Sequence, residues 1–151
     1  MVVGLISDTH GLIRPEALRA LASAEIILHA GDVGGGPVLD ALAAIAPVQA
    51  VHGNTDATDS LPAAIDCVLA GVSIHVSHGH EVGRPSPARL AACYAADVIV
   101  FGHTHRSVVA QVGRSLVVNP GAAGPRRFDV RPSVAVLELP DLYVTVIDLA
   151  R

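Results

Sequence analysis

Histidines, aspartates and one asparagine are concentrated in five short turns that contain glycine, and each turn follows a run of apolar residues. The seven side chains concerned are Asp8, His10, Asp32, Asn54, His78, His103 and His105. Seven carboxylate, amide and imidazole groups exceed the four ligands that a structural zinc site needs. They suit two adjacent divalent ions that share one carboxylate. The mixture of nitrogen and oxygen donors favours manganese, iron, zinc, cobalt or nickel over magnesium and calcium.

The spacing within two of these turns supports a metal site. Asp8 and His10 are two residues apart, which places both on one face of an extended segment, and the same holds for His103 and His105. A single histidine of this kind is more often a hydrogen-bonded core residue than a ligand. Four of them at strand ends beside glycines favour metal binding.

The three oxygen ligands also have structural alternatives. Asp8 and Asp32 could merely cap turns, but the histidines in the same set of turns favour metal binding by these carboxylates. Asn54 follows Gly53 and could be an ordinary turn residue, so its assignment as a ligand is favoured by a smaller margin.

Four further histidines bring the total to eight. His29 lies within a predicted strand, and we expect it to pack behind the site without binding metal. His75 is expected to face a sheet surface. His52 is a candidate for contact with the ligands, and His80 is expected to lie near a substrate.

Short apolar, β-branched runs must position these turns. Residues 2–6, 25–29 and 47–51 are predicted strands, and residues 15–22 and 37–46 are predicted helices that begin with proline. This alternation predicts parallel strands with right-handed crossovers. Ligands of parallel α/β sheets gather at the carboxyl ends of the strands, where the polar turns of this chain are found.

Hairpins dominate the second half of the chain. We expect strands over 65–69 and 72–77, over 107–112 and 115–118, and over 133–139 and 143–149, each pair joined by a tight turn. A helix over 87–95, capped by Ser86, and a strand over 97–101 lie between the first two pairs. The predicted fold class is α/β, a layered α-β-β-α sandwich of two mixed sheets flanked by helices, in one domain over residues 1–151.

Composition excludes several classes of protein. Of the 151 residues, 51% are hydrophobic and 16% are charged, against a usual charged fraction of ~25%, which excludes a disordered chain. The net charge of −4 argues against an extended nucleic-acid-binding surface and against a basic membrane-surface helix. No apolar run approaches the ~20 residues of a membrane span and no targeting segment is recognised, so a cytoplasmic protein is expected.

Two further expectations follow from composition. Cys67 and Cys93 are expected to be buried thiols in a reducing compartment, with a single bridge between them as the alternative. The high apolar fraction suggests a homo-oligomer.

In order along the chain, five motifs resemble those of the calcineurin-like metallophosphoesterase superfamily, above all its small single-domain YfcE-like bacterial and archaeal phosphodiesterases. The motifs are Asp8-Thr9-His10, Gly31-Asp32, Gly53-Asn54, His78-Gly79 and Gly102-His103-Thr104-His105, and Asn119-Pro120-Gly121 matches a further turn of the family. One Asp-x-His would carry no weight, but five motifs in order over residues 8–121 are specific.

The resemblance implies a dinuclear metal-dependent phosphodiesterase that acts on a small-molecule phosphate ester. Asp8, His10, Asp32 and His105 would hold the first ion, and Asn54, His78 and His103 would complete the site of the second. Asp32 would bridge the ions, and a hydroxide between them would attack phosphorus. Manganese is the expected metal, with iron, zinc, nickel and cobalt as alternatives.

One position departs from many relatives. Thr55 stands where they carry a histidine that assists the leaving group, and threonine cannot act as an acid near neutral pH. We therefore expect a preference for phosphodiesters or activated esters with good leaving groups. His80, Thr55 and Arg126 are predicted to contact the substrate, although Arg126 and Arg127 could equally lie in a solvated loop.

Two other functions stay open. A phosphomonoesterase is disfavoured because the leaving-group histidine is missing. A protein-interaction scaffold on the same fold, like the retromer subunit that resembles these enzymes, would have a degraded metal site. Here every ligand position is occupied, which favours catalysis, whereas the fold by itself cannot decide function.

Overall fold

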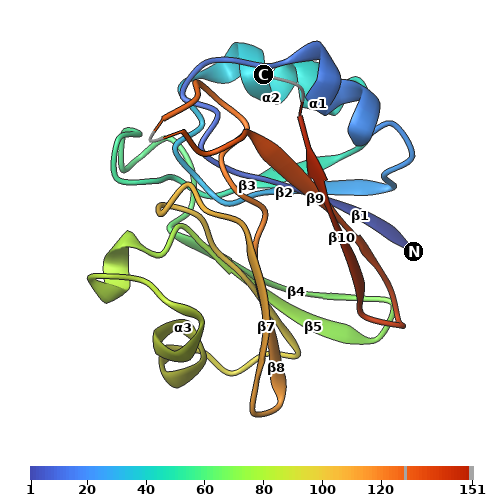
Figure 1. Cartoon of the computed structure of the whole chain (residues 1–151), viewed down its shortest axis with the longest axis vertical. Coiled ribbons are helices and arrows are strands. Elements are labelled where there is room, and N and C mark those ends of the chain that lie inside the picture. Colours follow the sequence, from blue (N-terminus) through green and yellow to red (C-terminus); the bar gives the residue numbers. More distant parts are fainter. Residues whose placement is uncertain (128, 150–151) are drawn as a thin grey trace.

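Two five-stranded sheets form the centre of the computed structural model, which describes residues 1–127 and 129–149 (Figure 1). The first sheet has the order β10-β9-β1-β2-β3 and consists of β1 (Val2–Ile6), β2 (Ile26–His29), β3 (Val48–Ala50), β9 (Ser133–Glu138) and β10 (Tyr143–Asp148). The second has the order β4-β5-β6-β8-β7 and consists of β4 (Ala64–Leu69), β5 (Val72–Ser77), β6 (Val98–Val100), β7 (Val108–Val112) and β8 (Ser115–Asn119).

Three neighbouring strands of the first sheet are parallel, as predicted. β1 pairs with β2 so that Ile6 lies opposite His29, and β2 pairs with β3 so that His29 lies opposite Ala50. β9 is antiparallel to β1, which makes the sheet mixed. The turns that follow β1, β2 and β3 therefore leave the sheet side by side.

The second sheet repeats this arrangement. β5, β6 and β8 are parallel, with Val76 opposite Val100 and Val100 opposite Val118, while β4 and β7 are antiparallel edge strands. The turns after β5 and β6 emerge together for the same reason as in the first sheet. The predicted α/β class with two mixed sheets is confirmed.

The helices cover the outer faces of the sheets. α1 (Pro15–Ala20) and α2 (Gly36–Ala43) lie on the first sheet, and α3 (Pro87–Cys93) lies on the second (Figure 1). Each ends two or three residues earlier than predicted. A 3-10 turn, η1 (His80–Val82), follows β5. Among the described residues, no helix combines the length and the apolar character needed to cross a membrane.

The core has three parts that match these layers. Val3, Leu5, Leu28, Val76 and Val100 belong to the largest cluster, which lies between the sheets. A second cluster lies under α1 and α2, and a third lies under α3. Burial on both faces explains why the central strands are almost continuously apolar.

The cysteines differ from expectation. Cys67 and Cys93 are free thiols, Cys67 is half-buried and Cys93 is exposed, so the prediction that both are buried is wrong. Cys93 is the last residue of α3, whose buried contact with the sheet is made by Leu90. Cys67 lies on the edge strand β4, which is only partly covered.

Candidate metal centre

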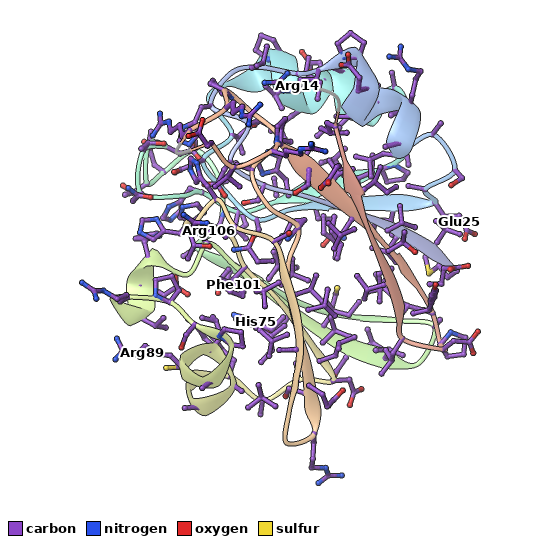
Figure 2. The ribbon with its side chains drawn as sticks, in the orientation of Figure 1. Arg14, Glu25, His75, Arg89, Phe101 and Arg106 are labelled. Carbon is purple, nitrogen blue, oxygen red and sulfur yellow. The ribbon has the colours of Figure 1, made fainter. Side chains whose placement is uncertain are left out.

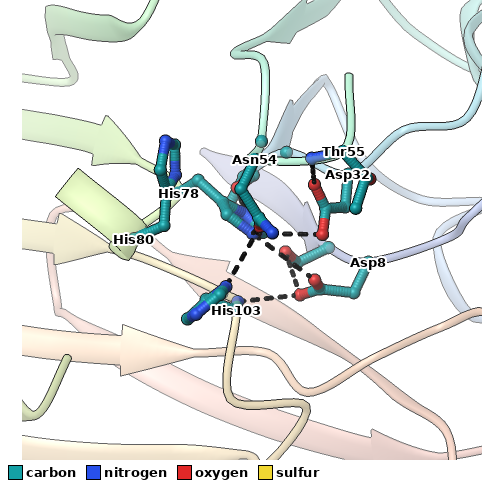
Figure 3. Close-up of polar contacts among 12 residues, drawn as sticks. Asp8, Asp32, Asn54, Thr55, His78, His80 and His103 are labelled. Atoms are coloured by element: carbon teal, nitrogen blue, oxygen red, sulfur yellow. Dashed lines mark hydrogen bonds and ion pairs between the residues drawn. The ribbon is translucent and has the colours of Figure 1, made fainter. Parts of the chain in front are cut away.

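The seven predicted ligands come together where the carboxyl ends of the parallel strands of both sheets meet. Figure 3 shows Asp8, Asp32, Asn54, His78 and His103 among them. Ligand atoms that lie within 4.8 Å of one another form two groups, Asp8–His10–His105 and Asp8–Asp32–His78. Asp8 belongs to both groups. Its Oδ1 atom is 3.4 Å from His105 Nε2 and 3.8 Å from His78 Nε2.

Asp32 also lies between the two groups. Its Oδ2 atom is 3.3 Å from His78 Nε2 and 3.7 Å from His10 Nε2. The remaining predicted ligands adjoin the His78 side, because Asn54 Oδ1 is 3.1 Å from His78 Nε2 and 3.2 Å from His103 Nδ1. The structure thus places two carboxylates centrally, with histidines on both sides of them.

The orientation of the buried His78 ring suits a cation. Its Nδ1 atom is 2.8 Å from the carbonyl oxygen of Ala30, which can only accept, so Nδ1 carries the proton and donates it. Nε2 therefore faces oxygens of Asn54, Asp32 and Asp8. Histidines that bind metals typically donate their second N–H to a carbonyl or carboxylate in this way.

The surroundings of the Asp8 carboxylate also suit a divalent cation. Its Oδ2 atom accepts hydrogen bonds from the Ser7 hydroxyl (2.7 Å) and from the His103 amide (3.1 Å). Its buried Oδ1 atom has no hydrogen-bond partner among residues 1–127 and 129–149, and the same holds for His105 Nδ1. An unpartnered buried carboxylate oxygen is costly, and a divalent cation would satisfy it.

The electrostatics keep the carboxylates charged. Burial opposes ionisation of Asp8, but contacts with His105, His78 and Ser7 outweigh it and lower the pKa of its carboxyl. At Asp32, burial is likewise outweighed by hydrogen bonds from His78 and the Thr55 amide, and the pKa falls below its usual range. Two anionic carboxylates thus share one partly enclosed site.

The histidines respond in opposite directions. Burial lowers the pKa of His10 and of His103. At His78, burial is outweighed by Asp32 and Asp8, and the pKa rises. A bound cation would displace the proton from His78 Nε2, and the donor set would then consist of carboxylate oxygens, an amide oxygen and imidazoles, the ligand types that bind divalent transition metals.

Backbone strain is concentrated at the same residues. Five of the seven predicted ligands have a positive φ, namely Asp8 (54°), His10 (47°), Asp32 (53°), His103 (72°) and His105 (64°). Each such residue costs on the order of 1–3 kcal/mol, and residues of this kind cluster at functional sites.

Hydrogen bonds between turns hold this strained arrangement. The amides of Asp8 and His10 donate to the carbonyls of Gly31 and Asp32. The Asp56 carboxylate accepts amides from Val33, Gly34 and Gly53 at 2.9–3.1 Å. Asp56 thereby ties the turn that carries Asn54 to the turn that carries Asp32.

A family model described as the calcineurin-like phosphoesterase superfamily domain matches residues 1–141. The chain belongs to this superfamily. The membership predicted from the five motifs is therefore confirmed, and the metal dependence of the calcineurin-like phosphoesterases agrees with the ligand groups described above.

Individual relatives point the same way. A probable metallophosphoesterase of Methanothermobacter thermautotrophicus is 34% identical over 92% of this chain and 86% of its own length. A phosphodiesterase of Methanocaldococcus jannaschii is 26% identical over 80% and 83% of the two chains. Wild-type Vps29 from Entamoeba histolytica, solved in complex with zinc, is 28% identical and has a TM-score of 0.82, covering 97% of this chain and 90% of that one.

The three residues predicted to contact the substrate differ in their position relative to the predicted ligands. His80 lies beside the ligands, with its ring centroid 5.4 Å from that of His78 and 6.3 Å from that of His103. Thr55 donates its amide to Asp32 Oδ1 at 2.9 Å. Arg126 is exposed and donates to the carbonyl of Asp129, so its contact with a substrate stays a prediction.

His29 packs behind the site, as expected. The Gly31 amide donates to its Nδ1 atom (3.1 Å), so the proton resides on Nε2, which donates to the Thr9 hydroxyl (3.0 Å). That hydroxyl in turn donates to the carbonyl of Val33 (2.7 Å). His29 thereby links the turns after β1 and β2, and complete burial lowers its pKa to about 4.

The low pKa of His29 predicts a pH-dependent stability. Its pKa is about 4 when folded and 6.5 in an unfolded reference, so the unfolded chain binds the extra proton between these values. The contribution of neutral His29 to the free energy of unfolding, roughly 3 kcal/mol, is fully present above pH 6.5 and is lost as the pH falls toward 4. In urea unfolding of the metal-free protein, the free energy of unfolding should change less with pH in His29→Gln than in the wild type. An equal change with pH in both proteins would contradict the prediction.

Sequence reasoning missed several supporting residues. Asn119 donates its side-chain amide to the Gly102 carbonyl and to the Thr104 hydroxyl, both at 3.0 Å, and so holds the turn that carries His103 and His105. The only signal in the sequence is the family turn to which Asn119 belongs. Ser7, which binds Asp8, gives no signal beyond its position directly before that residue.

His75 lies on the face of the second sheet that faces α3 (Figure 2). Its ring stacks on Tyr94 at a centroid distance of 3.8 Å, and its nitrogens contact Asp66 Oδ1 (2.8 Å) and the Ser77 hydroxyl (3.1 Å). It therefore faces a sheet surface, as expected, but Tyr94 covers it. His52, which was predicted as a candidate for contact with the ligands, has its ring centroid 6.4 Å from that of His80.

Proposed function

We propose that this protein is a phosphodiesterase that uses two divalent metal ions. The observation that carries the proposal is the central position of Asp8 and Asp32 between two groups of histidines. All ligand positions of the family motifs are filled, which a scaffold protein would not require. The phosphodiesterase from Methanocaldococcus jannaschii supports the choice of substrate class.

The first ion would be held by Asp8, His10, Asp32 and His105, and the second by Asp32, Asn54, His78 and His103. Bound divalent ions lower the pKa of coordinated water towards neutrality and neutralise the charge of phosphoryl oxygens. The chain itself orients the ligands: Ala30 fixes the His78 ring, and Ser7 with the His103 amide fixes the Asp8 carboxylate. Manganese is the expected metal, and the zinc complex of Vps29 supports zinc as an alternative.

Purified protein offers the direct test. Elemental analysis should find two divalent ions per chain after loading with manganese, nickel or zinc. The loaded protein should hydrolyse bis(p-nitrophenyl) phosphate, and a chelator should stop the reaction. A protein that binds no metal and hydrolyses no ester in any of these salts would contradict the proposal.

Thr55 leads to a prediction about the leaving group. Its amide is used to hold Asp32, and its hydroxyl cannot donate a proton to a departing alkoxide near neutral pH. We expect kcat for a nitrophenyl diester to exceed that for a dialkyl diester by at least a hundredfold, because nitrophenolate needs no proton to leave. Comparable kcat values for the two esters would contradict this.

A protein-interaction scaffold is the second candidate, and similarity to Vps29 favours it. The two functions differ in their dependence on the metal centre. A scaffold would show no turnover with any phosphate ester, even when both ions are bound.

A further inference from the structure

A hollow of about 210 Å³ opens between the turn after β2 and the long turn after β3. Those turns carry Asp32 and Asn54, and the hollow is lined from the residue after Asp32, Val33, and from the second residue after Asn54, Asp56. Its volume is below the roughly 300–1,000 Å³ of pockets that hold whole drug-sized ligands. It suits one substituent of a ligand whose remainder lies elsewhere.

The side chains that line the hollow are mostly apolar. Val33 is buried, and Leu39 and Leu61 are half-buried against the same core cluster. Gly35 and Gly36 line the hollow without side chains. A Cβ atom added to Gly36 would meet nothing within 4 Å, so this glycine leaves space that a larger residue would occupy.

The polar side chains of the hollow, Asp56 and Ser60, already make hydrogen bonds within the protein. One oxygen of the Asp56 carboxylate accepts the amides of Val33 and Gly53, and the other accepts the amide of Gly34. The Ser60 hydroxyl donates to the carbonyl three residues earlier. The side chains of the described lining residues include no cation, and the one charge among them is the Asp56 carboxylate, which repels an anionic substituent.

We infer that this hollow binds an uncharged, apolar ester group of a phosphodiester whose phosphate lies at the metal centre. The inference rests on the proposed function for the position of the phosphate. An apolar group gains by leaving water for the surface of Val33, Leu39 and Leu61, whereas a charged or strongly polar group finds no side chain that is free to pair with it. The expected substrates are therefore diesters in which at least one ester group is an uncharged hydrocarbon group.

Two unreactive diesters test this inference. Dibutyl and dimethyl phosphate differ by three methylenes on each arm, and a fully buried methylene increases affinity by about fourfold. Because the hollow is partly open, we expect dibutyl phosphate to inhibit hydrolysis of bis(p-nitrophenyl) phosphate about tenfold more strongly than dimethyl phosphate. Gly36→Leu should abolish the difference by filling the hollow.

The matched control adds the same side chain elsewhere on α2. Ala43→Leu changes an exposed residue at the end of that helix, outside the hollow, and should retain the tenfold difference. Equal inhibition by the two diesters in the wild-type protein would overturn the inference while leaving the phosphodiesterase intact.

If no ester is hydrolysed, a binding measurement tests the hollow independently of the proposed phosphodiesterase activity. In ¹⁵N NMR spectra, dibutyl phosphate should shift the amide signals of Gly35, Gly36 and Leu39, and dimethyl phosphate should not. Such shifts in a protein without turnover would support the hollow as a binding site and reject the proposed activity. The absence of these shifts would reject the hollow whether or not the protein is an enzyme.

Discussion

Replacement of Asp32 by alanine should abolish both metal loading and phosphodiester hydrolysis. Its Oδ2 atom is the one that approaches His78 on one side and His10 on the other, so the change removes a ligand from both proposed ion positions. Metal ions contribute several kcal/mol to stabilisation of the transition state, so we expect kcat/KM to fall by about a thousandfold or more. Elemental analysis and hydrolysis of bis(p-nitrophenyl) phosphate would measure the two effects.

Two comparisons make this result specific. Asp40→Ala removes an exposed carboxylate from α2 and should leave metal content and turnover unchanged. Bound ligands stabilise the folded state, so manganese should raise the melting temperature of the wild type and of Asp40→Ala but not of Asp32→Ala. Manganese-dependent hydrolysis that survives in Asp32→Ala would rule out this residue as a bridging ligand.

Much of the fold could be predicted because the residues at and just after each strand end indicate where the strand stops. Apolar β-branched runs stop at glycine-containing polar turns, so Ile6, His29 and Val76 fall at or near the ends of their strands in the structure, as predicted. The parallel pairing follows from the helices between the strands. Together these features bring distant turns to one edge of the sandwich without any knowledge of contacts.

Other features depend on contacts between distant segments and were missed or misjudged. Nothing near Asp56 in the sequence indicates that its carboxylate reaches the amides of Val33 and Gly34. The exposure of Cys93 depends on which face of α3 meets the sheet, and a helix of seven residues gives too little periodicity to decide this. The family resemblance assigned Asp8 to the first ion, which stays a prediction, and nothing in the sequence indicates that its Oδ1 atom also lies 3.8 Å from His78 Nε2.

Gly53→Ala should disable the metal centre by displacing Asp32. A Cβ atom at position 53 would overlap the Asp32 carboxylate and its amide nitrogen, at distances that real Cβ atoms do not adopt. Because Gly53 also donates its amide to Asp56, the turn cannot simply withdraw. A misplacement of about 1 Å at a catalytic group can cost about a hundredfold in rate. We expect a loss of at least this size in kcat/KM, accompanied by weaker manganese binding in calorimetry.

The control must separate a displaced ligand from a merely less stable fold. Gly71 lies in the β4–β5 hairpin with a φ of 78°, and a Cβ atom there would meet nothing within 4 Å. Gly71→Ala therefore costs about 1 kcal/mol of stability through backbone strain alone, while metal binding and kcat/KM stay at wild-type values. If Gly53→Ala behaved like Gly71→Ala, losing stability but retaining manganese, close packing of the Asn54 turn against Asp32 would not be what positions this carboxylate.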